Sequence, residues 1–420
     1  MSREWLITGA FTATALILAA AAARFEPESA PSEIFSDTGE QFFPGFRDVS
    51  QVTTIEVVDY DEAEAVARPL RVELRKGRYL ITSHGDYPAE ARDRLAKTAA
   101  ALLDMKKDSA VSDRLEDHAG YGVIDPLDDK NASLTGRGKR VTLKNSGGVT
   151  LAELILGKPV KEKSGFRYAR LPGQKRTYAV KTEADPSAHF ADWVEANLLR
   201  VTAADLTKLT LNAYQIDEQF GRIMNLQRTV MTRGTDTWNA QAQSVAGAMA
   251  SLRVVGARPK PPQLAEQLRA KRLELTLETM MSLRQRGFFV TPMGSLLSNE
   301  GELLAETSKN LNYVLRFGEV VTDTTAPGAR QKENRYLFVT VSARSPEATA
   351  AAESLDAKFS DWYYVIAGAD FARLHPGRAA QRKAEPQPQL PPGVRVAPGG
   401  PQIPAPEPSG PPPQPGPAKP

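Results

Sequence analysis

The amino-acid sequence predicts an α+β protein with mainly antiparallel sheets, built from two diverged copies of one sheet-plus-helix unit. Three observations support this prediction. Short alternating strands are joined through glycine turns, each half contains one main amphipathic helix, and a set of landmarks recurs in the same order. The 420 residues are ample for two such cores. A transmembrane helix is expected before the two copies, and a disordered proline-rich tail after them.

The N-terminal stretch 5–23 is uncharged and mostly apolar. As a helix, its residues reach roughly 28 Å at about 1.5 Å each, close to the ~30 Å hydrocarbon core of a bilayer. A cleaved signal peptide is the alternative, because the alanine run supplies small residues, but the stretch exceeds the usual signal core of about 7–15 residues. The sequence therefore favours residues 1–24 as a membrane anchor. Either interpretation sends the rest of the chain across the membrane.

Irregular segments are expected on both sides of the folded middle. Residues 25–49 carry prolines and acidic side chains and are predicted to be a linker. Residues 376–420 are predicted to be disordered, because 15 of the chain's 31 prolines lie in its last 36 residues and such a composition cannot bury a core. The tail is interpreted as a solvated segment without a specific ligand, with a tether or docking segment as the alternative.

The first copy is predicted to cover residues 50–201 and the second residues 202–375. Each copy opens with an alternating strand, at 54–58 and at 206–211. A second strand then ends in a turn that contains glycine and is followed by an aromatic residue. Strands that alternate in this way and are joined by short turns indicate antiparallel hairpins.

A proline-led amphipathic helix is expected next, after Pro88 in the first copy and after Pro261-Pro262 in the second. Four more landmarks follow in both copies: an aromatic–glycine step, a strand ending in glycine, a strand with a tyrosine and a closing Phe-x-Asp-Trp segment. The matched pairs are 120–123 with 287–290, 154–157 with 313–318, 166–169 with 336–339, and 190–193 with 359–362. A further alanine-rich helix is expected over 345–358, with Ser345 as its N-cap.

Four short motifs stand out in the first copy. They are Lys76-Gly77-Arg78-Tyr79, followed by the helix from Pro88, then Tyr121-Gly122-Val123-Ile124-Asp125-Pro126, Leu156-Gly157-Lys158-Pro159 and Tyr168-Ala169-Arg170. Over about residues 50–215, this order of motifs resembles an uncharacterised bacterial domain family with a Y-G-L-x-x-P step, an L-x-L-G strand and a Y-x-R strand. The resemblance implies a single-pass envelope protein, often encoded beside gliding-motility-type ABC transporter subunits. It implies no catalytic residue, because the family has no established activity.

The composition excludes several kinds of site. Without cysteine the chain has no disulfide, thiolate zinc site, iron–sulfur cluster or cysteine nucleophile. A balance of 53 basic against 50 acidic residues argues against nucleic acid as a partner. The four histidines are widely separated and show no metal-ligand spacing, so we expect no metal and no cofactor. These histidines are His84, His118, His189 and His375.

Three other candidates are given structural interpretations. Gly157-Lys158 is followed by proline where a phosphate loop needs serine or threonine, and the upstream glycine is missing. The acidic run Asp59–Glu64 lacks the spacing of an EF-hand and is predicted to be a solvated hairpin loop. The run Tyr363–Ile366 is predicted to be a buried strand, with an exposed partner surface as the alternative.

Asp192 and Asp361 are the only carboxylates that the repeated landmarks contain twice, each directly before a tryptophan. Two carboxyl groups about 5 Å apart would suit a retaining glycosidase. The favoured interpretation is that each aspartate caps a helix or turn, while Trp193 and Trp362 fill the core. No catalytic residue is therefore predicted, and we expect that the protein is not an enzyme.

Together these observations and the resemblance predict a non-catalytic, membrane-anchored accessory subunit of an ABC-type transport or cell-envelope complex. It would cross the bacterial inner membrane once, with the bulk of the chain in the periplasm. Its partners would be the membrane and the permease, ATPase or gliding-type auxiliary subunits of the transporter. Two alternatives stay open: a periplasmic hydrolase with an unrecognised polar site, and an envelope scaffold that uses the proline-rich tail.

Overall fold

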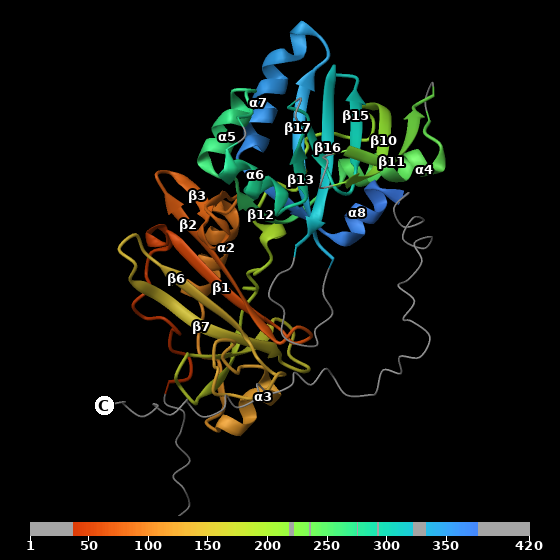
Figure 1. Cartoon of the computed structure of the whole chain (residues 1–420). Helices are drawn as coiled ribbons and strands as arrows, with labels where there is room; N and C mark the ends of the chain where they lie inside the picture. The colour runs from red at the N-terminus through yellow and green to blue at the C-terminus, as the bar shows by residue number, and fades with distance from the viewer. Residues whose placement is uncertain are drawn as a thin grey trace, which may run out of the picture. The chain divides into compact units, whose positions relative to one another are not determined.

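The structure, a computed structural model, describes residues 37–217, 222–234, 237–274, 276–291, 294–321 and 333–376. These residues belong to one compact unit that ends at Pro376. They form a nine-stranded sheet, a seven-stranded sheet and a two-stranded hairpin, with helices beside them (Figure 1). Paired strands in both sheets run antiparallel, which confirms the predicted α+β class with mainly antiparallel sheets.

The first sheet has the strand order β4-β3-β2-β1-β6-β7-β8-β9-β5. Its central strands place alternate residues such as Ile55 and Val57 in the core, as strand geometry requires. The helix α2 buries Leu95, Ala99 and Leu102 on one face. The elements are β1 Thr54–Asp61, β2 Val66–Arg75, β3 Arg78–Ile81, β4 Tyr87–Pro88, α2 Arg92–Leu103, β5 Ser109–Ser112, α3 His118–Tyr121, β6 Lys139–Lys144, β7 Thr150–Pro159, β8 Phe166–Arg170 and β9 Thr177–Lys181.

The second sheet has the order β11-β10-β15-β16-β17-β18-β12, and α7 packs along β17 (Figure 1). Its strands are β10 Leu206–Asp217, β11 Arg222–Thr232, β12 Val254–Pro259, β15 Glu302–Thr307, β16 Leu311–Val320, β17 Arg335–Ala343 and β18 Trp362–Ile366. The hairpin is β13 Phe288–Val290 with β14 Leu296–Ser298, and the helices are α4 Ala240–Ala250, α5 Pro262–Arg269, α6 Leu277–Arg284, α7 Thr349–Ser360 and α8 Gly368–Leu374. Short 3₁₀ helices are η1 Val49–Gln51, η2 Thr82–His84, η3 Leu115–Asp117, η4 Phe190–Asp192 and η5 Pro346–Ala348.

Seven strands of the first sheet lie in the same order as the seven strands of the second. The series β2-β1-β6-β7-β8-β9-β5 corresponds to β11-β10-β15-β16-β17-β18-β12 position by position, and the counterparts also follow each other in the same chain order. The first sheet continues beyond β2 with β3 and β4. In the described part of the second sheet, β11 is the last strand at the corresponding edge.

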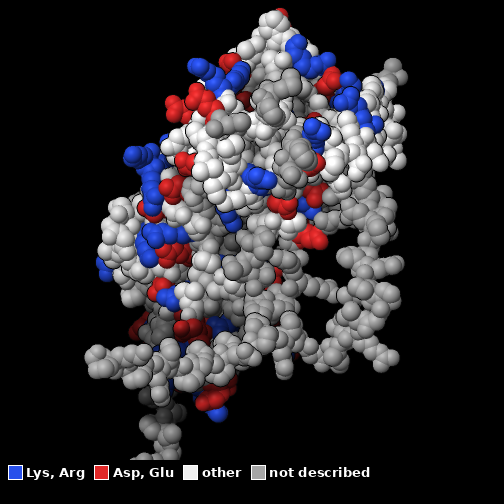
Figure 2. All heavy atoms as spheres, viewed as in Figure 1, with Lys and Arg blue, Asp and Glu red and all other residues white. Residues whose placement is uncertain are grey.

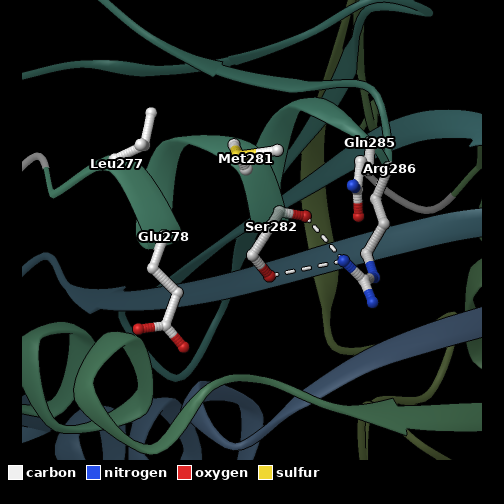
Figure 3. Close-up of a pocket in the computed structure, with 6 residues that line it drawn as sticks. All are labelled: Leu277, Glu278, Met281, Ser282, Gln285 and Arg286. Carbon is white, nitrogen blue, oxygen red and sulfur yellow. Dashed lines mark hydrogen bonds between the residues drawn. The ribbon is translucent and has the colours of Figure 1, made fainter.

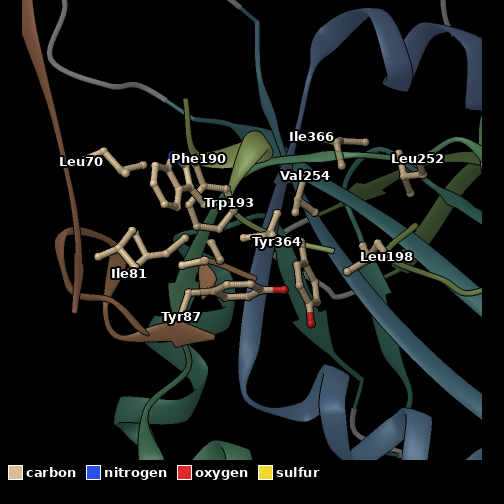
Figure 4. Packing of buried hydrophobic residues seen from close by; sticks show 14 of the residues in the cluster. Leu70, Ile81, Tyr87, Phe190, Trp193, Leu198, Leu252, Val254, Tyr364 and Ile366 are labelled. Atoms are coloured by element: carbon tan, nitrogen blue, oxygen red, sulfur yellow. The ribbon is translucent and has the colours of Figure 1, made fainter. Parts of the chain in front are cut away.

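One hydrophobic core runs through both halves and includes an aromatic cluster where they meet. The ring of Tyr87 in β4 lies 5.2 Å from that of Phe190 and 4.8 Å from that of Trp362, measured between centroids. Trp193 is 1% exposed, and Figure 4 shows it beside Phe190, with Tyr87 and Tyr364 adjacent. The two halves are therefore fused through packed aromatic side chains rather than joined by a free linker.

The two Phe-x-Asp-Trp segments do not occupy equivalent positions, so that matched pair is wrong. Residues 190–193 follow β9, whereas residues 359–362 end α7 and begin β18, the counterpart of β9. Both segments nevertheless supply rings to the contacts around Tyr87. The two segments therefore share a place at the junction and not a place in the strand order.

The main helix of the second half is also misplaced in the sequence prediction. The helix that follows β11, as α2 follows β2 to β4, is α4, capped by Asn239 through the backbone N–H of Ala242. Its alanine-rich sequence carries little amphipathic pattern. The long helix expected after Pro261 is two shorter helices, α5 and α6. The expected helix near residue 345 is present as η5 and α7, although the Ser345 side chain makes no capping bond.

Part of the predicted linker belongs to the core. Phe42, Phe43 and Phe46 are all buried, and the Tyr178 hydroxyl donates a 2.6 Å hydrogen bond to Asp37. The linker prediction is therefore wrong for residues 37–49, because the burial of three aromatic rings offsets the conformational entropy that this segment loses on ordering. The predicted anchor and the proline-rich tail from 377 onward lie outside the described residues. Among the residues that are described, no helix is long and apolar enough to span a membrane.

Candidate functional site

A cleft of about 630 Å³ lies where the two sheets meet. Its size falls within the range of small-molecule sites, about 300–1,000 Å³. The walls come from β2, η2 and η4 of the first half and from β12 and the neighbouring ends of β16, β17 and β18 of the second. The polar side chains that line it are Glu64, Arg68, His84, His189, Asp192, Arg258 and Asn334. The cleft therefore brings together residues that are widely separated in the sequence.

Charges of opposite sign neutralise each other on the first-half wall of the cleft. Arg68 pairs with Glu64 across the β1–β2 turn, and its Nε lies 3.3 Å from Asp61 Oδ2. Glu64 is 5% exposed. The prediction of a wholly solvated acidic loop is thus wrong at Glu64, because a guanidinium group close by in the hairpin compensates the buried carboxylate.

The segment that contains Asp192 is held by hydrogen bonds within one turn. The Ser187 hydroxyl donates to Asp192 Oδ2 at 2.6 Å and accepts from the backbone N–H of His189 at 3.0 Å. The indole Nε1 of Trp193 donates to the Ser187 carbonyl at 2.8 Å. Asp192 thus stabilises the turn that positions the buried Trp193. It also lines the cleft.

Asp361 has a different environment. It is the C-cap of α7, and its Oδ1 accepts a 3.0 Å hydrogen bond from Arg269 Nη2 in α5. Asp192 lines the cleft, whereas Asp361 is not among its lining residues. The two repeated aspartates therefore serve different local contacts. The tryptophans differ as well, since Trp193 is fully buried and Trp362 only partly.

The histidines separate into two groups. His84 and His189 both line the cleft, which their spacing in the sequence does not reveal. His118 is buried, its Nε2 lies 2.7 Å from the carbonyl oxygen of Lys175, and burial lowers its pKa. His375 is buried after α8 against the ring of Phe371. Within the described ranges, no three His, Cys, Asp or Glu side chains are grouped to hold a metal ion.

Sequence reasoning missed several buried charged groups, and Lys260, which follows β12, is the lysine among them. It is 4% exposed, and its Nζ donates a 2.9 Å hydrogen bond to the carbonyl oxygen of Phe359. The same ammonium group lies 3.9 Å from the ring centroid of Phe338 and 5.2 Å from that of Tyr363. Burial lowers the pKa of Lys260 to about 7, against the opposing charges of nearby carboxylates. A single lysine between prolines carries no sequence signal for such burial.

A second hollow, about 550 Å³, lies along α6 (Figure 3). Arg286 Nη1 donates to the Ser282 carbonyl at 2.7 Å and to its hydroxyl at 3.3 Å. The Ser282 hydroxyl lies 3.0 Å from the Tyr363 hydroxyl, and the Arg286 guanidinium lies 4.6 Å from the Tyr363 ring centroid. Figure 3 shows Leu277 and Met281 on the opposite side of the helix from this contact. The polar groups here hold α6 on the second sheet.

Two of the motifs that resemble the domain family, the step at 121–126 and the strand with Gly157, build a close backbone crossing. A Cβ atom on Gly157 would lie 2.5 Å from the carbonyl oxygen of Tyr121 and 2.6 Å from Val123 Cγ1. Gly122, between those two residues, has φ +70°, which glycine adopts without strain. Arg167 then donates to the Gly157 carbonyl from Nε at 3.1 Å and from Nη2 at 2.8 Å. These motifs are needed for packing the loop onto β7.

The second half contains the same crossing. A Cβ atom on Gly318 would lie 2.8 Å from Phe288 Cζ and would overlap the Arg286 carbonyl oxygen. Gly287 has φ +78°, and Arg335 donates to the Gly318 carbonyl at 3.2 Å. The geometry therefore pairs Gly122 with Gly287, rather than the sequence-matched glycine at position 120. Gly157-Lys158 lies within β7, where the Lys158 ammonium contacts backbone carbonyl oxygens of α3.

On the face shown in Figure 2, basic and acidic side chains are interspersed, in keeping with the net charge of +3.

The chain is an α+β protein in which two antiparallel sheets are fused and each contains one glycine crossing. The model of the family named Domain of unknown function (DUF4340) matches residues 80–293, about half of the chain, so the chain belongs to this family. The match runs from β3 to β13, later at both ends than the span expected from the motifs. No curated protein and no solved structure matches the chain.

Proposed function

We propose that this chain is a non-catalytic, membrane-anchored accessory subunit that serves an ABC-type transport or cell-envelope complex outside the cytoplasm. One observation carries the proposal: the polar residues that sequence analysis singled out have local structural partners. Asp192 braces the turn before Trp193, Asp361 pairs with Arg269, and His118 contacts a backbone carbonyl group. Side chains used in this way favour a scaffold over a catalytic centre.

We further propose that the two sheets are diverged copies of one unit. Their shared strand order supports this, and so does a shared irregularity in register. In β7–β8 the pairing shifts between Leu156 and Pro159, and in β16–β17 it shifts between Phe317 and Val320. Each shift surrounds the crossing glycine and ends opposite the arginine that donates to that glycine's carbonyl group, Arg167 or Arg335.

The anchor in this proposal is the apolar stretch 5–23, and the proline-rich tail extends from the other end of the chain. Between them, the aromatic contacts around Tyr87 fuse the copies into one platform. A fused platform presents its surfaces in a fixed relation, which suits a subunit that holds other proteins together. The transport chemistry would belong to a permease and an ATPase on other chains.

The test is purification of the full-length chain, carrying an affinity tag, from native membranes in mild detergent. We expect an ABC permease and its ATPase to be recovered with it, and we expect a variant lacking residues 5–23 to recover neither. A C-terminal reporter that is active only in the cytoplasm should stay silent. Recovery of the chain without any transporter or envelope subunit, or an active reporter, would contradict the proposal.

The cleft between the sheets favours a second candidate, a periplasmic hydrolase, because His84, His189 and Asp192 all line it. Asp192→Asn separates the two functions, since it keeps the shape and the hydrogen bond from Ser187 but removes the carboxylate. A scaffold should retain complementation of a deletion strain with this variant. Lost complementation in a variant that folds normally would favour the hydrolase, and Asp361→Asn is the matched control outside the cleft.

A further inference from the structure

The edge strand β11 differs from an ordinary surface strand. It is eleven residues long, ends its sheet within the described part of the chain, and is exposed along its length except at Met231. Its large apolar side chains Ile223, Met224, Leu226 and Val230 are between 42% and 54% exposed. A long edge of this kind offers unpaired backbone N–H and C=O groups to another strand, which native proteins usually prevent.

The first half shows how the corresponding edge is protected. There β2 is covered by β3, which pairs Ile81 with Val72 in antiparallel register, and β4 pairs in turn with β3. The other sheet ends are also protected: β5 has four residues and β4 two, while β12 packs against η4. Among the residues that the structure describes, no strand covers β11, whereas β3 covers its counterpart β2.

The chemistry of β11 indicates what covers it. After a bulge at Asn225, which has φ +54°, it pairs with β10 in continuous register from Gln227 to Thr232. Arg228 and Val230 lie on one face of this segment, opposite Asn212 and Thr210. The strand contains two arginines and no acidic residue. A second copy paired through the same edge would add two more arginines and no carboxylate, which disfavours self-association.

We propose that β11 is the docking edge for an extended segment of a partner protein, which adds a strand to the second sheet. The segment carries an apolar residue against Val230 and, two positions away on the same face, an acidic residue against Arg228. Backbone hydrogen bonds would supply affinity, and this alternating pair would supply selectivity. The inference rests on the proposed function only in taking the occupant to be a protein. It requires neither the anchor nor a transporter.

Two labelled synthetic peptides test the inference by fluorescence anisotropy with the full-length chain in mild detergent. The first peptide contains the sequence valine–threonine–glutamate–threonine–valine. The second peptide has lysine in place of the glutamate. We expect the glutamate peptide to bind about 1.4- to fivefold more tightly, the range that a favourable cross-strand charge pair supplies. Arg228→Glu should reverse the preference, and Val230→Lys should weaken both peptides.

The matched control is Val149→Lys, at a residue that is 60% exposed in the β6–β7 turn, and it should bind like the wild type. If Arg228→Glu lowers the melting temperature, Arg228→Gln replaces it and should abolish the preference. Equal binding of the two peptides, or a preference that survives these substitutions, would overturn the proposal. So would a wild-type dimer that Val230→Lys dissociates, because the occupant would then be a second copy. Failure of the anchor test leaves these outcomes unchanged.

Discussion

The two halves of the molecule share a strand order and differ in how its ends are closed. In the first half β2 is covered by β3, and the corner after β5 carries a surface pair in which Arg176 Nε lies 2.7 Å from Asp113 Oδ1. In the described part of the second half no strand covers β11, and the corner after β12 buries Lys260. Departures from ordinary packing mark the places where function is most often found. By that criterion we propose that the uncovered strand and the buried lysine of the second half are the places to test for function.

The largest expected effect concerns the junction between the halves. Trp193→Ala should lower the free energy of unfolding by about 3–5 kcal/mol, because it empties a fully buried site and removes the bond to the Ser187 carbonyl. Trp362→Ala should cost less, about 1–3 kcal/mol, because that ring is partly exposed. Urea unfolding followed by circular dichroism measures both. An equal or larger loss for Trp362→Ala would contradict this ranking of the two tryptophans.

The glycine crossings give the next effect and test the likeness of the halves directly. Gly157→Ala and Gly318→Ala should each cost about 1–3 kcal/mol or more, because the new methyl group overlaps backbone atoms of the crossing loop. Gly247→Ala in α4 is the control. Its Cβ would meet nothing within 4 Å, and it should stabilise the helix by about 0.5–1 kcal/mol. A loss of stability in only one of the variants Gly157→Ala and Gly318→Ala would contradict the proposal that the two halves share this crossing.

The pH dependence of stability distinguishes the corner after β12, which buries Lys260, from the corner after β5, which carries the surface pair Arg176–Asp113. The folded pKa of Lys260 is about 7, below its ordinary value of 10.5, so the folded chain loses the proton first. The cost of burying the charge is fully present below pH 7 and diminishes as the pH rises toward 10.5. Stability attributable to this group should therefore rise by about 1.4 kcal/mol per pH unit in that window.

Lys260→Met should remove that slope, measured as the difference between wild-type and variant unfolding free energies from pH 7 to pH 10. Lys271→Met is the control, since Lys271 is exposed and pairs with Glu353 at the surface. The slope should persist in that variant. A wild-type slope no steeper than that of Lys260→Met would show that the buried ammonium group does not titrate in this range.

Local patterns predicted much of this fold because their signals lie in short windows. Alternation located β1 and β10, and the dense run Tyr363–Ile366 was rightly interpreted as a buried strand. Gly318, near the end of β16, was matched to Gly157 from sequence alone. The register shifts that give these glycines a shared geometry depend on neighbouring strands and are not visible in either segment by itself.

The remaining features depend on contacts between distant segments. The cleft joins His84 to His189, and the burial of Lys260 depends on rings from β17 and β18. The α4 helix lacks the amphipathic period that reveals α2. The three phenylalanines at 42, 43 and 46 were a usable signal, because rings spaced so closely seldom remain in a solvated linker.

The open edge of the second half can be tested in its natural surroundings because the chain contains no cysteine. Single thiols introduced as Val230→Cys and as Val149→Cys report on β11 and on the exposed β6–β7 turn. Their rates of reaction with a maleimide are compared between native membranes and the purified full-length chain. We expect Val230→Cys to react readily after purification and to be protected in native membranes, while Val149→Cys reacts equally in both. Equal reaction at position 230 in the two preparations would show that no partner covers β11.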